Sequence, residues 1–160
     1  MIQLKEAFSG ISKEEFTQLI DVPVWLSLFA AYSQDGQVSE YEKAEAVKLA
    51  HLRTFTAPKS LRKFYEKVDE HFEERFSTLD KRLPGSDADR KVYLQAQIKN
   101  GHAILHKLDS DITESLEESL ESFYEHVFRA DQSFFQYFAL PVISNRLDKK
   151  SGHFKFHKES

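Results

Sequence analysis

A stripe of apolar residues with the spacing of an α-helix runs through the middle of the chain. Its members follow one another at intervals of three or four positions: Leu61, Phe64, Val68, Phe72, Phe76 and Leu79. The positions between them are largely charged, which is typical of an amphipathic helix. Such a helix is stable only when its apolar face packs against other elements, so this stretch must belong to a larger folded domain.

Signals for helix starts recur along the chain and extend the helical prediction. Ser12 with Glu15, and Ser39 with Glu42, match the S-x-x-E capping box, in which the two side chains bond the free amides of a helix start. The chain has only five Gly and four Pro, which argues against an all-β fold with many tight turns. We therefore predict an all-α fold: a single helical bundle of about seven helices, the last of which contains residues 134–143.

Weaker local signals refine this picture. Asp21 is predicted to cap the helix that follows it. Asp111 and Glu114 predict a third capping box, and Asn100-Gly101 predicts a bend within a long helix.

Length and composition indicate one domain. The 160 residues suffice for one sizeable core, and we expect an all-helical domain over 1–147 followed by a flexible basic tail over 148–160. There are no cysteines, and the net charge is −4, so the chain lacks the basic bias of a nucleic-acid binder. No apolar run reaches the roughly 20 residues that span a bilayer. We expect a cytoplasmic protein that does not span a membrane.

Residues 31–45 resemble the second half of a calcium-binding loop. Relative to an EF-hand loop, Asp35 stands at a ligand position and Gly36 at the position of the glycine. Ser39 and Glu42 stand at two further ligand positions, but Ala31 stands at the first one. A helix cap explains Gly36, Ser39 and Glu42 without any ion. It leaves unexplained Asp35 and also Glu45, which lies one helical turn beyond Glu42.

The run from Trp25 to Leu52, "WLSLFAAYSQDGQVSEYEKAEAVKLAHL", resembles the first repeat of a TerB-like (tellurite-resistance TerB) domain. The shared features are Asp-Gly after an apolar helix, a β-branched residue two positions after the Gly, and Glu seven positions after the Asp. The resemblance implies an all-helical domain of two related halves. It also implies that Asp35 and Glu42 contribute to a divalent-cation site, to which the spacing adds Glu45.

The second half of the chain carries only a faint echo of this motif. Aligning Ile112 with Val38 places Asp109 at the position of Asp35, but Leu116 at the position of Glu42. We therefore expect any cation bound at Asp35, Glu42 and Glu45, whether Ca²⁺, Mg²⁺ or Mn²⁺, to bind weakly. Residues 24–55 and 102–128 are predicted to form degenerate repeats.

Two further groups of residues could carry function. His102 and His106 are one helical turn apart, which is the spacing of a metal-binding pair, although two histidines without a third ligand more often merely share a helix face. Residues 109–125 contain seven acidic and no basic side chains. Such a run is usually one solvated helix face, and its functional interpretation is an acidic patch for a basic partner.

The motifs of common enzyme families are absent from the sequence. We therefore predict that the chain is not an enzyme but a TerB-like helical module of a bacterial stress-response or tellurite-resistance system, which binds a divalent cation weakly through acidic residues. The alternative is a metal-free protein–protein interaction module that uses its acidic helix face. The sequence does not identify the protein partner, and it is compatible with a homo-oligomer.

Overall fold

The computed structural model describes residues 7–35 and 38–128, and every regular element within these residues is helical. This confirms the all-α helical bundle. The predicted count of about seven helices is not matched, and the last predicted helix, 134–143, lies outside the described residues. The elements are α2 (Lys13–Ile20), α3 (Val22–Asp35), α4 (Glu40–Thr56), the short 3₁₀ helix η1 (Lys59–Leu61), α5 (Arg62–Lys81), α6 (Asp87–Leu105) and α7 (Ser110–Phe128).

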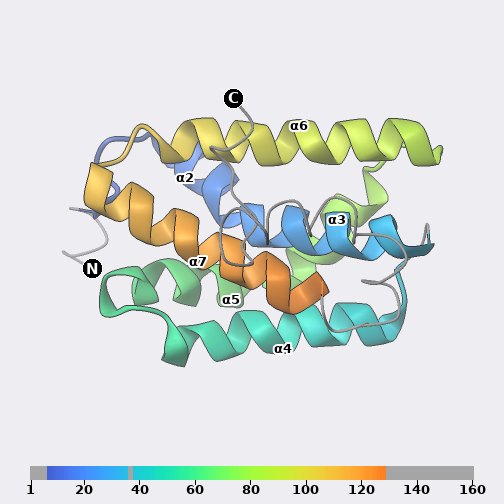
Figure 1. The fold of residues 1–160 in the computed structure, drawn as a ribbon, viewed down its shortest axis with the longest axis horizontal. Coiled ribbons are helices and arrows are strands. Elements are labelled where there is room, and N and C mark those ends of the chain that lie inside the picture. The colour runs from blue at the N-terminus through green and yellow to red at the C-terminus, as the bar shows by residue number, and fades with distance from the viewer. Residues whose placement is uncertain (1–6, 36–37, 129–160) are drawn as a thin grey trace, which may run out of the picture.

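The helices lie side by side in a bundle with α6 along one edge and α4 along the opposite edge (Figure 1). Between these edges run α3 and α7. The central helix is α3, which contacts α2, α4, α5, α6 and α7. Its sequence is apolar almost all round, and Val22, Leu26 and Leu28 are fully buried, as expected of a helix enclosed by others.

The long amphipathic helix is confirmed. The predicted stripe, from Leu61 in η1 to Leu79 near the end of α5, is buried throughout. Tyr65 is also buried, and its hydroxyl shares a hydrogen bond of 2.6 Å with the Ser119 hydroxyl of α7. Apolar contacts and this hydrogen bond together hold α5 to the rest of the core.

Both S-x-x-E capping boxes are confirmed. The hydroxyl of Ser12 accepts from the amide of Glu15 at 3.0 Å, and the carboxylate of Glu15 accepts from the amide of Ser12 at 2.9 Å. Ser39 and Glu42 make the same pair of bonds at 3.0 and 2.8 Å. The helix starts at α2 and α4 are therefore set by their local sequence.

The other local signals gave different outcomes. The backbone of Asp21 is helical (φ −80°, ψ −13°) and not extended as at an N-cap, and its carboxylate accepts two hydrogen bonds from Arg75 of α5. The predicted box of Asp111 and Glu114 is wrong, because α7 already begins at Ser110. The helix α6 continues without a break through Gly101.

The α3 and α4 helices run in opposite directions and touch (Figure 1). Gly36 itself lies outside the described residues, as does the predicted tail 148–160. No helix within the described ranges is long and apolar enough to cross a bilayer.

Candidate metal centre

Two histidines at the C-terminal end of α6, His102 in its last turn and His106 directly after it, lie with one glutamate of α7 where these antiparallel helices meet. The position of α6 is set by its close approach to α3 at Gly101. A Cβ atom at this position would lie 2.4 Å from Cγ2 of Val22, so only glycine fits without movement of its neighbour. His102 is the next residue of α6, and His106 lies one helical turn later, directly after the end of the helix.

The start of α7 is tied to the end of α6 by one side chain. Thr113 is buried, and its hydroxyl approaches the main-chain oxygens of Leu105 at 2.9 Å and Leu108 at 3.2 Å. Residues four apart share one face of a helix, so Glu117 lies one turn after Thr113 on that face. The tight connection therefore brings Glu117 opposite the two histidines.

The three side chains point their ligand atoms at one another. The Nε2 atom of His102 is 3.1 Å from Oε2 of Glu117, and Nε2 of His106 is 3.4 Å from the same oxygen. The two Nε2 atoms are 3.0 Å apart, with the imidazole planes at 76°. Glu117 is 8% exposed, whereas the side chain of His106 is 49% exposed, so the site opens to solvent on one side only.

These separations have the size that a single metal ion produces. Zinc lies about 2.0–2.2 Å from nitrogen and oxygen ligands, which places two ligand atoms about 2.8–3.6 Å apart for coordination angles from about 90° to tetrahedral. All three distances fall in that range. Hydrogen bonds among the three side chains would give the same distances. A binding measurement must therefore distinguish a metal-bound site from a metal-free site that is held together by hydrogen bonds.

Within the described residues, His102, His106 and Glu117 form a group of ligand atoms close enough to hold one ion. The sequence spacing indicated the histidine pair but not the third candidate ligand, because Glu117 stands within the acidic run 109–125. The short connection between α6 and α7 could have revealed it, since folding one helix back on the other pairs residues about 15 apart.

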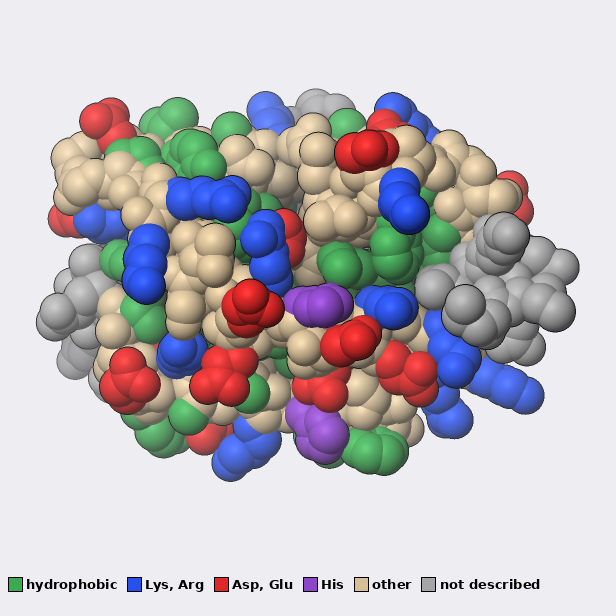
Figure 2. All heavy atoms as spheres, turned by 180° about the vertical axis from the view of Figure 1, so that it is seen from behind, with side chains coloured by type: hydrophobic (Ala, Val, Ile, Leu, Met, Phe, Trp, Pro, Cys, Tyr) green, Lys and Arg blue, Asp and Glu red, His purple; other side chains and the backbone are tan. Residues whose placement is uncertain are grey.

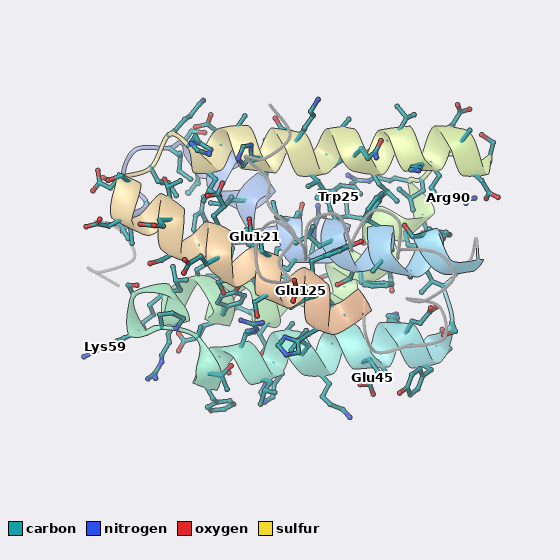
Figure 3. All side chains as sticks on the ribbon, viewed as in Figure 1. Trp25, Glu45, Lys59, Arg90, Glu121 and Glu125 are labelled. Atoms are coloured by element: carbon teal, nitrogen blue, oxygen red, sulfur yellow. The ribbon has the colours of Figure 1, made fainter. Side chains whose placement is uncertain are left out.

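Of the three predicted cation ligands, the structure describes the side chains of Glu42 and Glu45. Asp35 ends α3, and its side chain lies outside the described part. The carboxylate of Glu42 accepts from the amide of Ser39, and that of Glu45 lies 3.4 Å from Nζ of Lys48. Figure 3 shows Glu45 directed away from the bundle, below α4. A cation site formed by Asp35, Glu42 and Glu45 stays a prediction.

The acidic run 109–125 is not simply a solvated face. Glu114 and Glu118 are exposed, but Glu117 and Glu121 are buried, the latter only 1% exposed. These two glutamates are buried because α7 packs against α3, α4 and α6, so that more than one side of the helix is covered.

A second place where histidine meets carboxylates lies between α4 and α5. A hollow of about 580 Å³ is lined by Lys43, Val47, His51, Asp69, Glu70, Glu73, Glu74 and Ser77. Figure 2 shows acidic side chains gathered on the side of the molecule where α5 lies. Nδ1 of His51 is 3.0 Å from Oδ2 of Asp69. No third ligand atom converges on this pair among the described residues, so it offers a matched comparison for the metal centre.

Comparisons with protein-family models, with curated proteins and with solved structures found no match to this chain.

Proposed function

We propose that this protein is a helical module that binds a divalent transition-metal ion of the zinc class through His102, His106 and Glu117. The observation that supports this is the triangle of ligand atoms with sides of 3.0, 3.1 and 3.4 Å. Imidazole nitrogens favour borderline ions such as Zn²⁺, Co²⁺ and Ni²⁺. The site contains one carboxylate, whereas Ca²⁺ requires about six to eight oxygen ligands.

Three protein ligands leave at least one coordination position open on the exposed side, beside His106. A bound ion would hold water or a ligand from outside there, because zinc takes about four ligands. The ion would also join α6 to α7, so that binding would stabilise the fold. We assign no reaction to the site, and propose a binding role.

Metal titration of chelator-treated protein tests this proposal. At a free zinc concentration about 100 times Kd, binding adds about 2.7 kcal/mol to the free energy of unfolding. For a chain of this size we expect Tm to rise by about 5–10 °C. Ca²⁺ and Mg²⁺ should give no comparable rise. Bound Co²⁺ should show the visible absorption of a low-symmetry site with nitrogen ligands.

Two variants should remove these responses: His106→Ala, which changes an exposed side chain, and Glu117→Gln, which keeps the shape and removes the charge. Glu118→Gln is the matched control, because Glu118 is the exposed neighbour of Glu117. His51→Ala removes the histidine of the pair between α4 and α5. His153 and His157 also stand four positions apart in the sequence, and a double change to Ala tests whether they bind the ion instead. If zinc binding survives Glu117→Gln and His106→Ala, the proposed site is wrong.

The TerB-like assignment, a cytoplasmic stress-response role and a weak Ca²⁺, Mg²⁺ or Mn²⁺ site at Asp35, Glu42 and Glu45 form a second proposal. It is supported by the Asp-Gly motif and by the antiparallel pair of helices α3 and α4. In this proposal, α6 and α7 form a second, degenerate copy of that pair. An ion would compete with the amide of Ser39 for Glu42 and with Lys48 for Glu45. A gain in Tm with millimolar Ca²⁺, Mg²⁺ or Mn²⁺ that Asp35→Asn abolishes would support this site, and no gain would contradict it.

The metal-free alternative is a module that binds a basic partner through the exposed acids of α7. Asp111, Glu114 and Glu118 are the exposed members that support it. A basic partner should then bind equally well to the Glu117→Gln variant, which separates this function from metal binding.

A further inference from the structure

The outer face of α4 carries exposed apolar side chains at the edge of the bundle. Tyr41, Leu52 and Phe55 are 61%, 51% and 66% exposed. They share one helix face with Glu45 and Lys48, because 41, 45, 48, 52 and 55 follow at alternating intervals of four and three. This is the spacing of the contact seam in a coiled coil. Within the described residues no helix lies beyond α4 on this side (Figure 1).

The residues on this face are arranged so that a second copy of the helix, running antiparallel, would place complementary side chains opposite one another. From one end the face shows Tyr41, Glu45, Lys48 and Leu52: aromatic, acidic, basic and apolar. A second α4 running antiparallel would place Leu52 opposite Tyr41 and Lys48 opposite Glu45. The same contacts recur across the two-fold axis, since an isologous interface makes every contact twice.

We propose that this face of α4 binds a second copy of the same chain in antiparallel orientation, with the two-fold axis between Glu45 and Lys48. Tyr41 packs on the partner's Leu52 at each side of the axis, and Glu45 pairs with the partner's Lys48 twice. Within one chain, Nζ of Lys48 is already 3.4 Å from Oε2 of Glu45. In the dimer the four charges form one cluster.

The register follows from both charge and packing. Shifting the helices by one turn would put Lys48 opposite the partner's Lys48 and remove both ion pairs, and shifting them by two turns would put Lys48 opposite the partner's Leu52. In antiparallel seams, such charge pairs set orientation and register more than strength. At the outer ends of the seam, Phe55 reaches the partner's Val38, which is partly exposed and lies two residues before the start of α4.

The expected dimer is weak. The α4 helix has 17 residues and is about 25 Å long at about 1.5 Å per residue. One helix pair of this length lies at the low end of specific interface areas, below about 1,200 Å². We therefore expect association in the micromolar range or weaker, and a monomer in dilute solution.

This inference is independent of the metal centre, which lies between α6 and α7 at the other side of the bundle. The dimer is measured by sedimentation equilibrium over a wide concentration range in the presence of a chelator, so that no metal can bridge two chains. Lys48→Glu places Glu opposite Glu45 twice, and Glu45→Lys places Lys opposite Lys48 twice. Each should weaken association by about tenfold or more, since close charge pairs at interfaces contribute this much.

The double variant, Glu45→Lys with Lys48→Glu, restores opposite charges in the same register and should recover the association constant of the native chain. Leu52→Glu should abolish the dimer. Lys63→Glu is the control, because Lys63 is an exposed lysine of α5 that pairs with Glu66. An unchanged far-ultraviolet circular dichroism spectrum and Tm show that each variant is folded. A chain that stays monomeric at millimolar concentration overturns the proposal, as does a dimer that tolerates both single charge reversals.

Discussion

Thr113 at the start of α7 holds the end of α6 through its hydroxyl, which lies 2.9 Å from the main-chain oxygen of Leu105. The bond is buried and spans the connection between the helices. It fixes the register in which α7 runs back along α6, and therefore the distance from Glu117 to the two histidines. A residue outside the three candidate ligands thus positions the candidate metal centre.

Thr113→Val should weaken metal binding without changing a ligand. Valine keeps the shape, but leaves the buried oxygens without this donor, at a cost of about 1–3 kcal/mol of unfolding free energy. We expect a larger zinc Kd in isothermal titration calorimetry, together with a lower Tm in chelator. Thr17→Val is the matched control, because the Thr17 hydroxyl donates to the main-chain oxygen of Lys13 in an exposed part of α2. Equal zinc affinities for both variants would contradict the positioning role.

The contrast between Ser39 and Glu117 shows what the sequence could predict. Ser39 and Glu42 form their capping box within one helical turn, so the pattern of residues determines the contact. The contact of Glu117 with His102 depends on how two helices meet, and that is set by a buried threonine and by a glycine packed on Val22. Sequence spacing predicted the helices and the histidine pair, but no local signal singled out Glu117 among the seven acids of the run 109–125.

Asp21 and Arg75 illustrate the same limit. The sequence around Asp21 suggested a helix cap, because Asp is a good N-cap residue. The structure uses its carboxylate for an ion pair with a residue 54 positions away. A long-range ion pair of this kind is favoured over a local helix cap where the carboxylate is buried, because a buried charge needs a charged partner.

Arg75→Ala tests that ion pair. Nε and Nη2 of Arg75 donate to the two oxygens of Asp21 at 3.0 and 2.7 Å, and Asp21 is only 6% exposed. Hydrogen bonds to charged groups contribute about 1.5–3 kcal/mol, and we expect a loss of this size in urea unfolding. The control, Lys63→Ala, breaks an exposed pair with Glu66 and should cost less than about 0.5 kcal/mol. A loss at Arg75 no larger than at Lys63 would show that the pair is not stabilising.

Gly101→Ala should destabilise the fold although alanine favours helices. Alanine gains up to about 1 kcal/mol of helix propensity over glycine, but its Cβ would lie 2.4 Å from Cγ2 of Val22. Overpacking of this kind costs about 1–3 kcal/mol. Measured by urea unfolding, the loss should shrink in a Val22→Ala background, where Cγ2 is absent. If Gly101→Ala is stabilising in the native background, α6 does not need this close approach to α3.

The hydroxyl of Tyr32 makes the free energy of unfolding depend on pH in the alkaline range. It donates to Oδ1 of Asp80 at 2.5 Å, and the Arg90 guanidinium lies 4.4 Å from the ring centre. Burial, and then the bond to Asp80, raise the pKa of Tyr32 from 10 to about 12, because both disfavour the phenolate.

A pKa raised on folding means that the folded state holds the proton more tightly. The stabilisation is therefore complete below about pH 10 and is lost as the pH rises through about 12. Tyr32→Phe should cost about 1 kcal/mol at pH 8, and the difference from the native chain should shrink between pH 10 and pH 12 in urea unfolding. In an Asp80→Asn background this change with pH should be smaller, since the charge that opposes the phenolate is gone. A difference between native and Tyr32→Phe chains that stays constant from pH 8 to pH 12 would show that the hydroxyl titrates alike in the folded and unfolded states.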